Sequence, residues 1–305
     1  MTKLCAISVD LDEIPFYHQI HGLPEPEGPS ETVVYDIALE RLEAFASAHE
    51  IPLTLFAIGQ NLSRTAAAER LRQMARKGHE IGNHTYGHRY DLTRLPREVM
   101  RSEVERGAEA IEQTTGVRPT GFRAPGYTVT DELFAILDEA GVRYDSSVFP
   151  CPAYWSAKAV AIGLIALRGR SSHSVVDTPN VLRAPTRPYR IGRPYWKPGK
   201  GLVELPIQVT RGARLPFIGT SLTLAGPTGA RLLAKMCVGE PFVNLELHGI
   251  DVLDEADGLS ALTKHQPDVR VPHARKLEAL SAAIEVLSKA GYSFVRLDEA
   301  AAQVA

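Results

Sequence analysis

Two aspartates one residue apart are the first side chains whose types and spacing suggest chemistry. Asp10 and Asp12 end an apolar run in the sequence SVDLDE. Residues two positions apart in a strand point to the same side. Two neighbouring carboxylates repel each other unless a proton or a cation lies between them. An Asp-x-Asp pair also ends many strands that bind nothing, so the pair indicates a site only together with other ligands.

A pair of histidines supplies such ligands. His84 and His88 lie four residues apart in the segment HEIGNHTYGH, and this spacing lets both imidazoles face one point on a helical turn. The segment lacks the HExxH motif of zinc proteases, because Thr85 stands where their glutamate would. One carboxylate of the Asp10–Asp12 pair completes three ligands and leaves a fourth position open, as in catalytic metal sites. A chance pair among 10 histidines is the alternative.

The sequence FRAPGY places a charged residue inside an apolar run. Burying Arg123 is costly unless an anion is paired with it, and we expect Asp10 to be that anion. The turn at Pro125 and Gly126 would direct a backbone N–H toward a developing oxyanion. A plain turn beside a surface arginine is the alternative.

A histidine ends the apolar run LELHG. His248 at a strand end, followed by glycine, suits an exposed proton donor. A histidine satisfied within the core is the alternative.

These residues need a fold that brings distant positions together. Strand-like runs, bounded by turn residues, alternate with helix-like runs that carry one apolar face. Strands are expected at 4–9, 53–58, 79–83, 120–123, 142–147, 203–207, 242–248 and 292–297, and helices at 33–46, 66–77, 96–115, 130–141, 229–236 and 272–289. Roughly seven or eight such units form an α/β barrel, in which catalytic groups follow the carboxyl ends of strands. The candidate residues all fall at those ends.

Length and composition fit one soluble domain. The 305 residues are 44% apolar and 23% charged, which predicts a single domain over residues 1–305. A net charge of −2 without a basic run argues against nucleic acid as a partner. Three widely spaced cysteines form no disulfide framework. The first residues lack the apolar core of a signal peptide, so we expect a cytoplasmic protein.

The segment 151–201 breaks the alternation. It is rich in Pro, Arg, Ser and Gly, and we expect an irregular insertion that covers the barrel mouth as a lid. Trp155 and the stretch 189–196 would stack on sugar rings there. Ala159–Leu167 is too short to span a bilayer and is expected to be a buried helix, with a helix on a membrane surface as the alternative. The arginines of the segment 151–201 would bind the phosphates of a lipid-linked sugar. They are Arg168, Arg170, Arg183, Arg187, Arg190 and Arg193.

Taken together, the motifs Asp-x-Asp, GNHTYGH, RAP and LELH resemble the polysaccharide deacetylases, carbohydrate esterase family 4, which carry the NodB homology domain. The resemblance covers residues 4–147 and 202–298. It implies a deformed (β/α)7-type barrel interrupted by the insertion. The Asp-x-Asp spacing, where most members have adjacent aspartates, resembles the branch of intracellular glycolipid deacylases and allantoinase-like amidohydrolases.

The resemblance also implies roles for the candidate residues. Asp10 becomes the catalytic base and Asp12 the metal ligand beside His84 and His88, with exchange of the two aspartates left open by the altered spacing. His248 becomes the acid.

The third motif departs from the family's RPPY, because Gly126 precedes Tyr127 here. Which backbone N–H forms the oxyanion hole is therefore open. Asp145, in YDSS, stands for the family's Asp–Trp motif.

The predicted reaction is hydrolysis of an N-acetyl or N-formyl group on an amino sugar or glycolipid. One divalent ion is expected, with zinc first and cobalt, nickel, iron or manganese as alternatives. The expected partner is a small-molecule or lipid-linked N-acylated sugar, with peripheral membrane contact as a further option. The alternatives are an amidohydrolase acting on a cyclic ureide or imide, and a sugar-binding barrel without activity.

Overall fold

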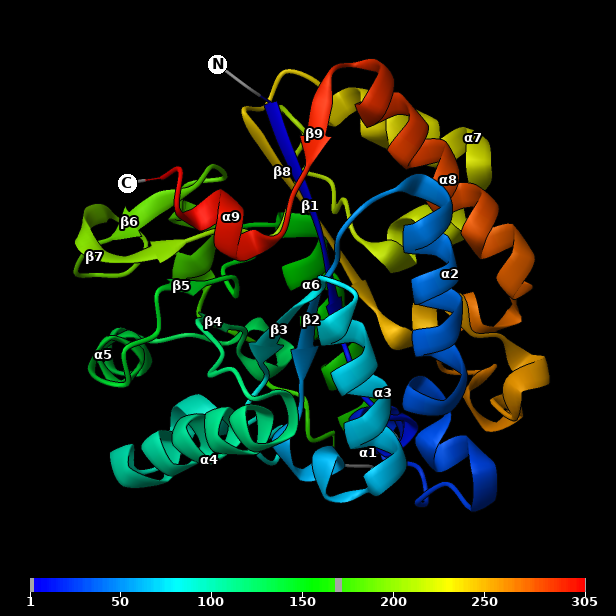
Figure 1. The fold of residues 1–305 in the computed structure, drawn as a ribbon, viewed down its shortest axis with the longest axis horizontal. Coiled ribbons are helices and arrows are strands. Elements are labelled where there is room, and N and C mark those ends of the chain that lie inside the picture. The colour runs from blue at the N-terminus through cyan, green and yellow to red at the C-terminus, as the bar shows by residue number, and fades with distance from the viewer. Residues whose placement is uncertain (1–2, 168–171, 305) are drawn as a thin grey trace.

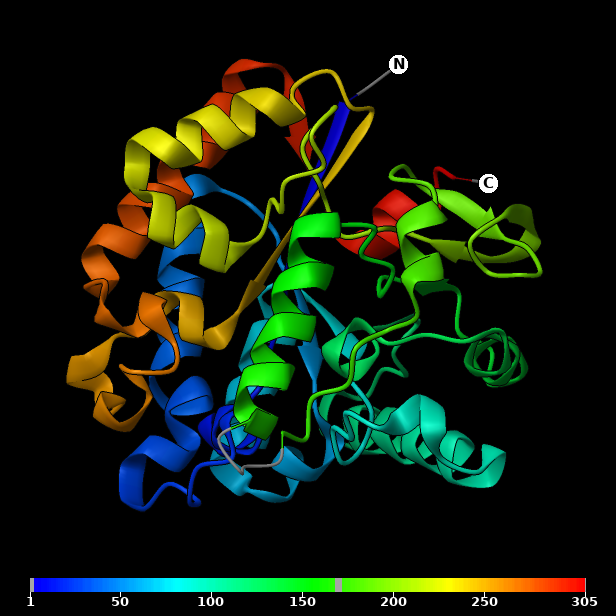
Figure 2. The same cartoon turned by 180° about the vertical axis from the view of Figure 1, so that it is seen from behind.

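A curled sheet forms the centre of the computed structural model, which describes residues 3–167 and 172–304 (Figures 1 and 2). Its strands are β1 (Lys3–Asp10), β2 (Thr54–Ala57), β3 (Glu80–Asn83), β4 (Gly121–Phe122), β5 (Tyr144–Asp145), β6 (Tyr189–Ile191), β7 (Pro198–Glu204), β8 (Phe242–His248) and β9 (Tyr292–Phe294). The order is β6-β7-β5-β4-β3-β2-β1-β8, and β9 pairs with the first residues of β1. Among the named strands only β6 and β7 pair antiparallel. This curled half-barrel confirms the predicted deformed α/β barrel.

Helices pack around the sheet. They are α1 (Ile14–His21), α2 (Leu39–His49), α3 (Thr65–Arg76), α4 (Arg97–Thr115), α5 (Asp131–Glu139), α6 (Pro152–Leu167), α7 (Gly219–Cys237), α8 (His273–Lys289) and α9 (Leu297–Ala301). α2 and α3 lie on one face of the sheet and α6 on the other (Figures 1 and 2). α7 and α8 lie side by side beyond β1 and β8 (Figures 1 and 2). In the described part of the chain, no helix is long and apolar enough to cross a membrane.

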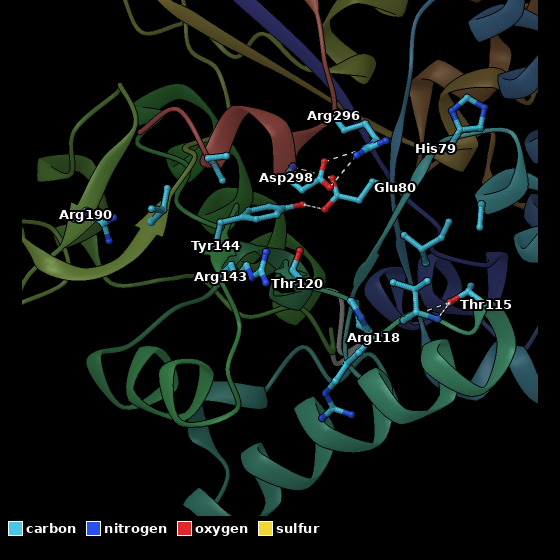
Figure 3. A pocket seen from close by; sticks show the side chains of 17 residues that line it. His79, Glu80, Thr115, Arg118, Thr120, Arg143, Tyr144, Arg190, Arg296 and Asp298 are labelled. Carbon is cyan, nitrogen blue, oxygen red and sulfur yellow. Dashed lines mark hydrogen bonds and ion pairs between the residues drawn. The ribbon is translucent and has the colours of Figure 1, made fainter. Parts of the chain in front are cut away.

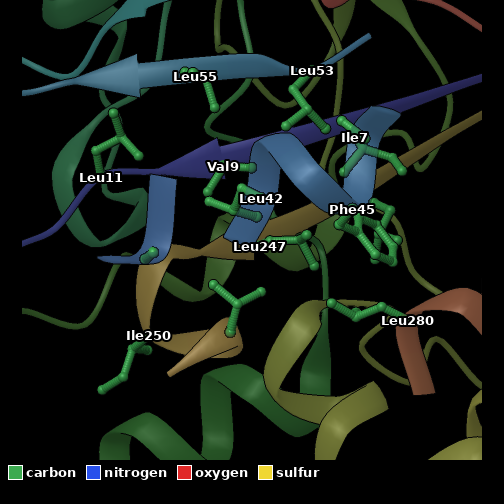
Figure 4. Close-up of a cluster of buried hydrophobic side chains, with 14 of the residues drawn as sticks. Ile7, Val9, Leu11, Leu42, Phe45, Leu53, Leu55, Leu247, Ile250 and Leu280 are labelled. Atoms are coloured by element: carbon green, nitrogen blue, oxygen red, sulfur yellow. The ribbon is translucent and has the colours of Figure 1, made fainter. Parts of the chain in front are cut away.

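The two faces of β1 explain how the sheet positions the site. Ile7 and Val9 point outward and are buried with Leu42 of α2 and Leu247 of β8 (Figure 4). Burial of each such side chain contributes about 1.5–3 kcal/mol. The alternating residues, Ser8 among them, point to the inner side. The outer core therefore fixes the strand whose inner face carries polar side chains.

Most predicted elements are confirmed, and the errors lie where periodicity was weak. β8 matches its predicted range residue for residue, and the helix expected after Thr130 begins there, with Thr130 Oγ1 accepting the Leu133 N–H at 3.2 Å. The expectation of an irregular insertion was wrong, since α6, β6 and most of β7 lie within 151–201. The helices α1 and α9 were not predicted. No residue of α6 is buried, so the prediction of a buried helix was also wrong.

Candidate active site

Strand register brings the candidate residues to one edge of the sheet. Asp10, the last residue of β1, is paired with His248, the last residue of β8. Asn83 of β3 is paired with Phe122 of β4, so His84 and Arg123 follow as neighbours. These side chains all lie at the carboxyl ends of parallel strands, where α/β barrels place their active sites.

Three side chains converge on one point in the loop after β3 and the end of β1. The Asp12 Oδ1 lies 3.3 Å from the Nε2 of His84 and 3.2 Å from the Nε2 of His88. The two Nε2 atoms are 3.2 Å apart. All three residues are buried. They form a candidate metal-binding triad, as the sequence predicted.

The protonation pattern of His84 fits a metal ligand. Its Nδ1 lies 2.7 Å from the carbonyl oxygen of Arg123, and because a carbonyl only accepts, the Nδ1 carries the hydrogen. The Nε2 of a neutral His84 then presents a lone pair to the triad. The buried Asp12 Oδ1 makes no hydrogen bond with any described residue. Ligands of a tetrahedral zinc ion, bound at about 2.0–2.1 Å, lie roughly as far apart as these three atoms, so the residues fit a divalent ion.

A strained loop, rather than the expected helical turn, holds the two histidines. Thr85 has φ 67° and His88 has φ 51°, conformations that cost energy and cluster at functional sites. The loop is fastened from within, since Asn83 Oδ1 accepts the Thr85 N–H and Thr85 Oγ1 accepts the His88 N–H, both at 3.0 Å. The packing of α4 leaves no room for a side chain at Gly107, where a Cβ would lie 2.4 Å from Asn83 Oδ1.

Arg123 is fully buried and pairs with Asp10, which confirms the predicted partner. Its Nη1 donates to Asp10 Oδ1 at 2.7 Å. Its Nη2 donates to the hydroxyls of Ser8 and Ser146 at 2.9 and 2.8 Å, and its Nε donates to the Ser146 carbonyl at 2.7 Å. Four hydrogen bonds thus hold the guanidinium, which in turn fixes Oδ1 of Asp10. The other oxygen, Oδ2, faces His84 and His248.

The sequence analysis missed Glu246, which pairs with His248. The His248 Nδ1 lies 2.9 Å from Glu246 Oε1, and its Nε2 lies 4.0 Å from Asp10 Oδ2. Burial lowers the pKa of His248, but the negative charges of Glu246, Asp10 and Asp12 outweigh burial and raise this pKa well above the usual value. The available signal was an acidic residue two positions before His248 in an otherwise apolar strand, and therefore on the same face.

The turn after β4 lies against the second cluster. Gly126 and Tyr127 both have φ 60°. The Tyr127 N–H donates to the Ala124 carbonyl at 3.0 Å, which favours Gly126 as the free backbone donor. The Tyr127 hydroxyl lies 3.3 Å from His248 Nε2. Asp145 lies deeper, where its carboxylate accepts the N–H and the hydroxyl of Ser147.

Within the described part of the insertion, α6 contacts the turn after β4 directly. The Tyr154 ring packs on Tyr127, and the Lys158 ammonium donates to the Gly126 carbonyl at 2.8 Å. The aromatic stretch 189–196 does not cover the mouth as expected, because Tyr195 packs on Phe134 of α5. The prediction that 189–196 covers the mouth was wrong because Tyr195 packs on an apolar side chain at the sheet edge instead.

The insertion arginines have separate places. Arg187 pairs with Glu240 at 2.7 Å. Arg190 lines a cavity at the opposite end of the sheet. Arg168 and Arg170 lie outside the described residues.

The model of the polysaccharide deacetylase family matches residues 36–144. This match contains His84, His88 and Arg123. Over these residues the chain is similar to the polysaccharide deacetylases.

Two curated members of the family match part of the chain. A peptidoglycan deacetylase from Helicobacter pylori is 24% identical over 147 residues, which cover 48% of this chain and 49% of that protein. A peptidoglycan-N-acetylglucosamine deacetylase from Bacillus cereus is 29% identical over 131 residues, which cover 43% and 57%. The matched part thus spans about half the length of each relative.

Solved structures extend the likeness in fold to the whole chain. A protein from Mycobacterium smegmatis described as a polysaccharide deacetylase aligns with a TM-score of 0.62 at 20% identity, covering 100% of this chain and 91% of that one. A family 4 pseudoenzyme from Bacillus anthracis aligns with a TM-score of 0.53 at 13% identity, covering 98% and 66%. A fold shared with a pseudoenzyme leaves the argument for activity to the site residues.

Proposed function

We propose that this protein is a metal-dependent hydrolase that removes an N-acetyl or N-formyl group from an amino sugar or glycolipid. The observation that carries the proposal is the placement of two complementary clusters at one mouth. Asp12, His84 and His88 direct lone pairs at a common point. Asp10, with Arg123 behind it, and His248, with Glu246 behind it, face that point from the other side.

Asp12, His84 and His88 would hold the ion, with zinc first and cobalt, nickel, iron or manganese as alternatives. When bound, a divalent ion polarises an acyl oxygen and acidifies a water molecule. His84 is oriented for this role by the Arg123 carbonyl, since a hydrogen bond to the second ring nitrogen fixes a ligand imidazole.

Asp10 is placed to act as the base. Arg123 holds Asp10 Oδ1, so Oδ2 is the oxygen left to take a proton from water. This Oδ2 lies 3.7 Å from His84 Nε2 and 4.0 Å from His248 Nε2, between the triad and the acid. The proton and the two reacting groups would therefore meet within a few ångströms, as general base catalysis requires.

His248 is placed to protonate the leaving amine. The negative charge of Glu246 favours the protonated imidazole, and the Glu246 carboxylate lies 2.9 Å from Nδ1, so that Nε2 faces the site. The N–H of Gly126 would stabilise the oxyanion, while Lys158 holds the carbonyl of the same residue.

We further propose that a lipid-linked sugar is the preferred form of the substrate. α6 lies in front of the sheet in Figure 2. Lys158 is its single charged residue. Val160 and Leu164 are 61% and 48% exposed on it. A mostly apolar helix without a buried residue, held beside the catalytic turn by Lys158, would accept an acyl or prenyl chain.

The activity is tested with purified protein loaded with zinc. Release of acetate or formate is measured from N-acylated sugars and their lipid-linked forms, with allantoin as the cyclic ureide. Release from N-acylated sugars supports the proposal. Turnover of allantoin alone would assign the cyclic amidohydrolase reaction, and sugar binding without turnover would assign a non-catalytic barrel.

The lipid preference is tested on the exposed face of α6. Val160→Ser combined with Leu164→Ser should lower turnover of the lipid-linked sugar and leave the soluble sugar unaffected. Leu232→Ser on α7, 61% exposed, is the matched control. Equal turnover of both substrates by all variants would refute the preference while leaving the deacylase assignment intact.

A further inference from the structure

A second cavity lies at the end of the sheet opposite the catalytic residues. It has a volume of about 580 Å³ and surrounds the amino ends of β3, β4 and β5 (Figure 3). Glu80 begins β3 and lines this cavity, whereas Asn83 ends the strand and leads into the metal triad. The two sites therefore use opposite ends of the same strands. The volume is typical of pockets for small organic molecules.

Arginine is the prevailing charged residue around this cavity. Arg118, Arg143, Arg190 and Arg296 line it, against two carboxylates, Glu80 and Asp298. Arg296 is satisfied by Asp298, with its Nε and Nη2 at 2.9 and 3.1 Å from the two carboxylate oxygens. The wall thus holds more cations than its own anions balance.

Glu80 does not neutralise the remaining arginines, because its carboxylate is already used. Its Oε1 accepts the Tyr144 hydroxyl at 2.6 Å, as the dashed line in Figure 3 shows. Its Oε2 accepts the Thr54 hydroxyl at 2.8 Å and the Asp298 N–H at 3.0 Å. Glu80 is also buried, so it forms the floor of the cavity and holds strands and α9 together.

Arg118 pairs with Glu112 at 2.9 Å, so Arg143 and Arg190 are the two lining arginines without an anion among the described residues. Both are exposed, and neither forms an ion pair with any residue in the described ranges. Arg190 donates to the Gly201 carbonyl at 3.2 Å, which orients its guanidinium without neutralising it. Arg143 lies directly before β5 and Arg190 on β6, so the two approach from different segments of the sheet. An anion that offers several oxygens would satisfy both, since guanidinium groups bind phosphate in bidentate fashion.

The cavity also has an apolar wall, formed by Ile81, Val117, Val203 and Ala301. Val117 is 69% exposed, so burying it under a ligand would be favourable. We propose that this cavity binds a small organic phosphate, with the dianion on Arg143 and Arg190 and the organic group against the apolar wall. This second site is separate from the catalytic mouth and does not depend on the proposed deacylase activity.

The proposal is tested by calorimetric titration of the metal-loaded protein with phenyl phosphate and with inorganic phosphate. Phenyl phosphate should bind more tightly, because it also covers the apolar wall. Arg143→Gln with Arg190→Gln should weaken binding by about tenfold or more, the scale of two lost charge-assisted hydrogen bonds. Arg143→Lys should recover part of the affinity by restoring the charge.

Arg270→Gln serves as the charge-matched control, because Arg270 is exposed, lies away from the cavity and forms no ion pair with a described residue. Thermal unfolding of each variant checks that the fold is kept. An affinity that falls equally in the control and the double variant would overturn the site, as would an absence of binding to the wild type. Binding that persists in the double variant but disappears in His84→Ala would place the phosphate at the catalytic metal and also overturn it.

Discussion

Asp10 and Asp12 lie at the same mouth, yet their negative charges are balanced in different ways. Asp10 meets a cation from its own chain, the buried Arg123, at 2.7 Å. Asp12 meets two imidazoles, and its Oδ1 receives no hydrogen bond from the described residues. Asp10 thus has a buried cation paired with it in the folded chain, whereas the charge of Asp12 would be balanced by a cation from solution. This difference favours Asp10 as the base and Asp12 as the ligand.

One residue connects the two clusters. The Arg123 guanidinium binds Asp10, and its backbone carbonyl accepts the Nδ1 hydrogen of His84. A change of the Arg123 side chain therefore affects the base but leaves the contact to His84 in place. The two clusters can be separated by mutation, because they depend on different atoms of the same residue.

The largest effect on activity is expected from changes to the triad Asp12, His84 and His88, which lacks a cation of its own. His84→Ala and His88→Ala should each lose the bound ion and about 10³-fold or more in kcat/KM, because a metal supplies several kcal/mol of transition-state stabilisation. Metal content by mass spectrometry and turnover are measured on the same samples. Full metal occupancy in the double variant would contradict the assignment. His79→Ala, which removes a histidine at the opposite end of β3, is the control.

The next effect distinguishes the two aspartates. Asp10→Asn should keep the metal and lose roughly 10²-fold or more in kcat, the scale of a positioned base. Asp12→Asn should instead lower metal affinity. The reverse pattern, with metal lost in Asp10→Asn and kept in Asp12→Asn, would show that the roles of the two aspartates are exchanged.

Removal of the Arg123 side chain should lower the stability of the fold more than it lowers the metal content. Arg123→Met leaves Asp10 as an unpaired buried charge, which is expected to lower the free energy of unfolding by about 3–5 kcal/mol. Adding Asp10→Asn should restore part of that loss, because the unpaired charge is then gone. Denaturant unfolding of the two single variants and the double variant measures the coupling. Strict additivity would show that the buried pair contributes nothing as a pair.

A change in pH dependence is expected from the acid. If His248 is the acid, turnover requires its protonated form and falls as the pH rises through its pKa. Glu246 raises that pKa, so Glu246→Gln should move the alkaline limb of the kcat/KM profile to lower pH. Glu278→Gln, on the surface, should leave the limb in place. An unchanged limb in Glu246→Gln would mean that His248 is not the group that titrates.

The convergence of the candidate site residues at one edge of the sheet could be predicted because their signals are local. Asp10, Asp12, His84 and His88 occur in short motifs, and the alternation of strands and helices places those motifs at one end of a barrel. The pairing of Arg123 with Asp10 followed from the cost of burying a lone charge. None of these inferences required knowledge of a long-range contact beyond strand order.

The failures concern contacts that the sequence does not specify. The segment Ala159–Leu167 of α6 is apolar, which predicted burial, yet no residue of α6 is buried. The stretch 189–196 was expected at the mouth because the insertion follows a barrel strand, but Tyr195 packs on α5. The loop that carries His84 and His88 depends on positive φ angles at Thr85 and His88. The residue types at these positions do not indicate such angles. The cytoplasmic location and the lid role of the insertion stay predictions.

The smallest effect should come from Tyr127. Its substitution distinguishes a role of the side-chain hydroxyl at His248 from a role of the backbone in this turn. The Tyr127 N–H is engaged by the Ala124 carbonyl, whereas its hydroxyl lies 3.3 Å from His248 Nε2. If the hydroxyl positions the imidazole, Tyr127→Phe should lower kcat by roughly fivefold, which corresponds to one hydrogen bond of about 1 kcal/mol. Metal content should stay unchanged, because Tyr127 contacts neither histidine of the triad. Tyr154→Phe, whose ring packs on Tyr127, controls for packing. Wild-type kcat in Tyr127→Phe would show that the hydroxyl contributes nothing, and would direct the search for the oxyanion donor to the backbone of this turn.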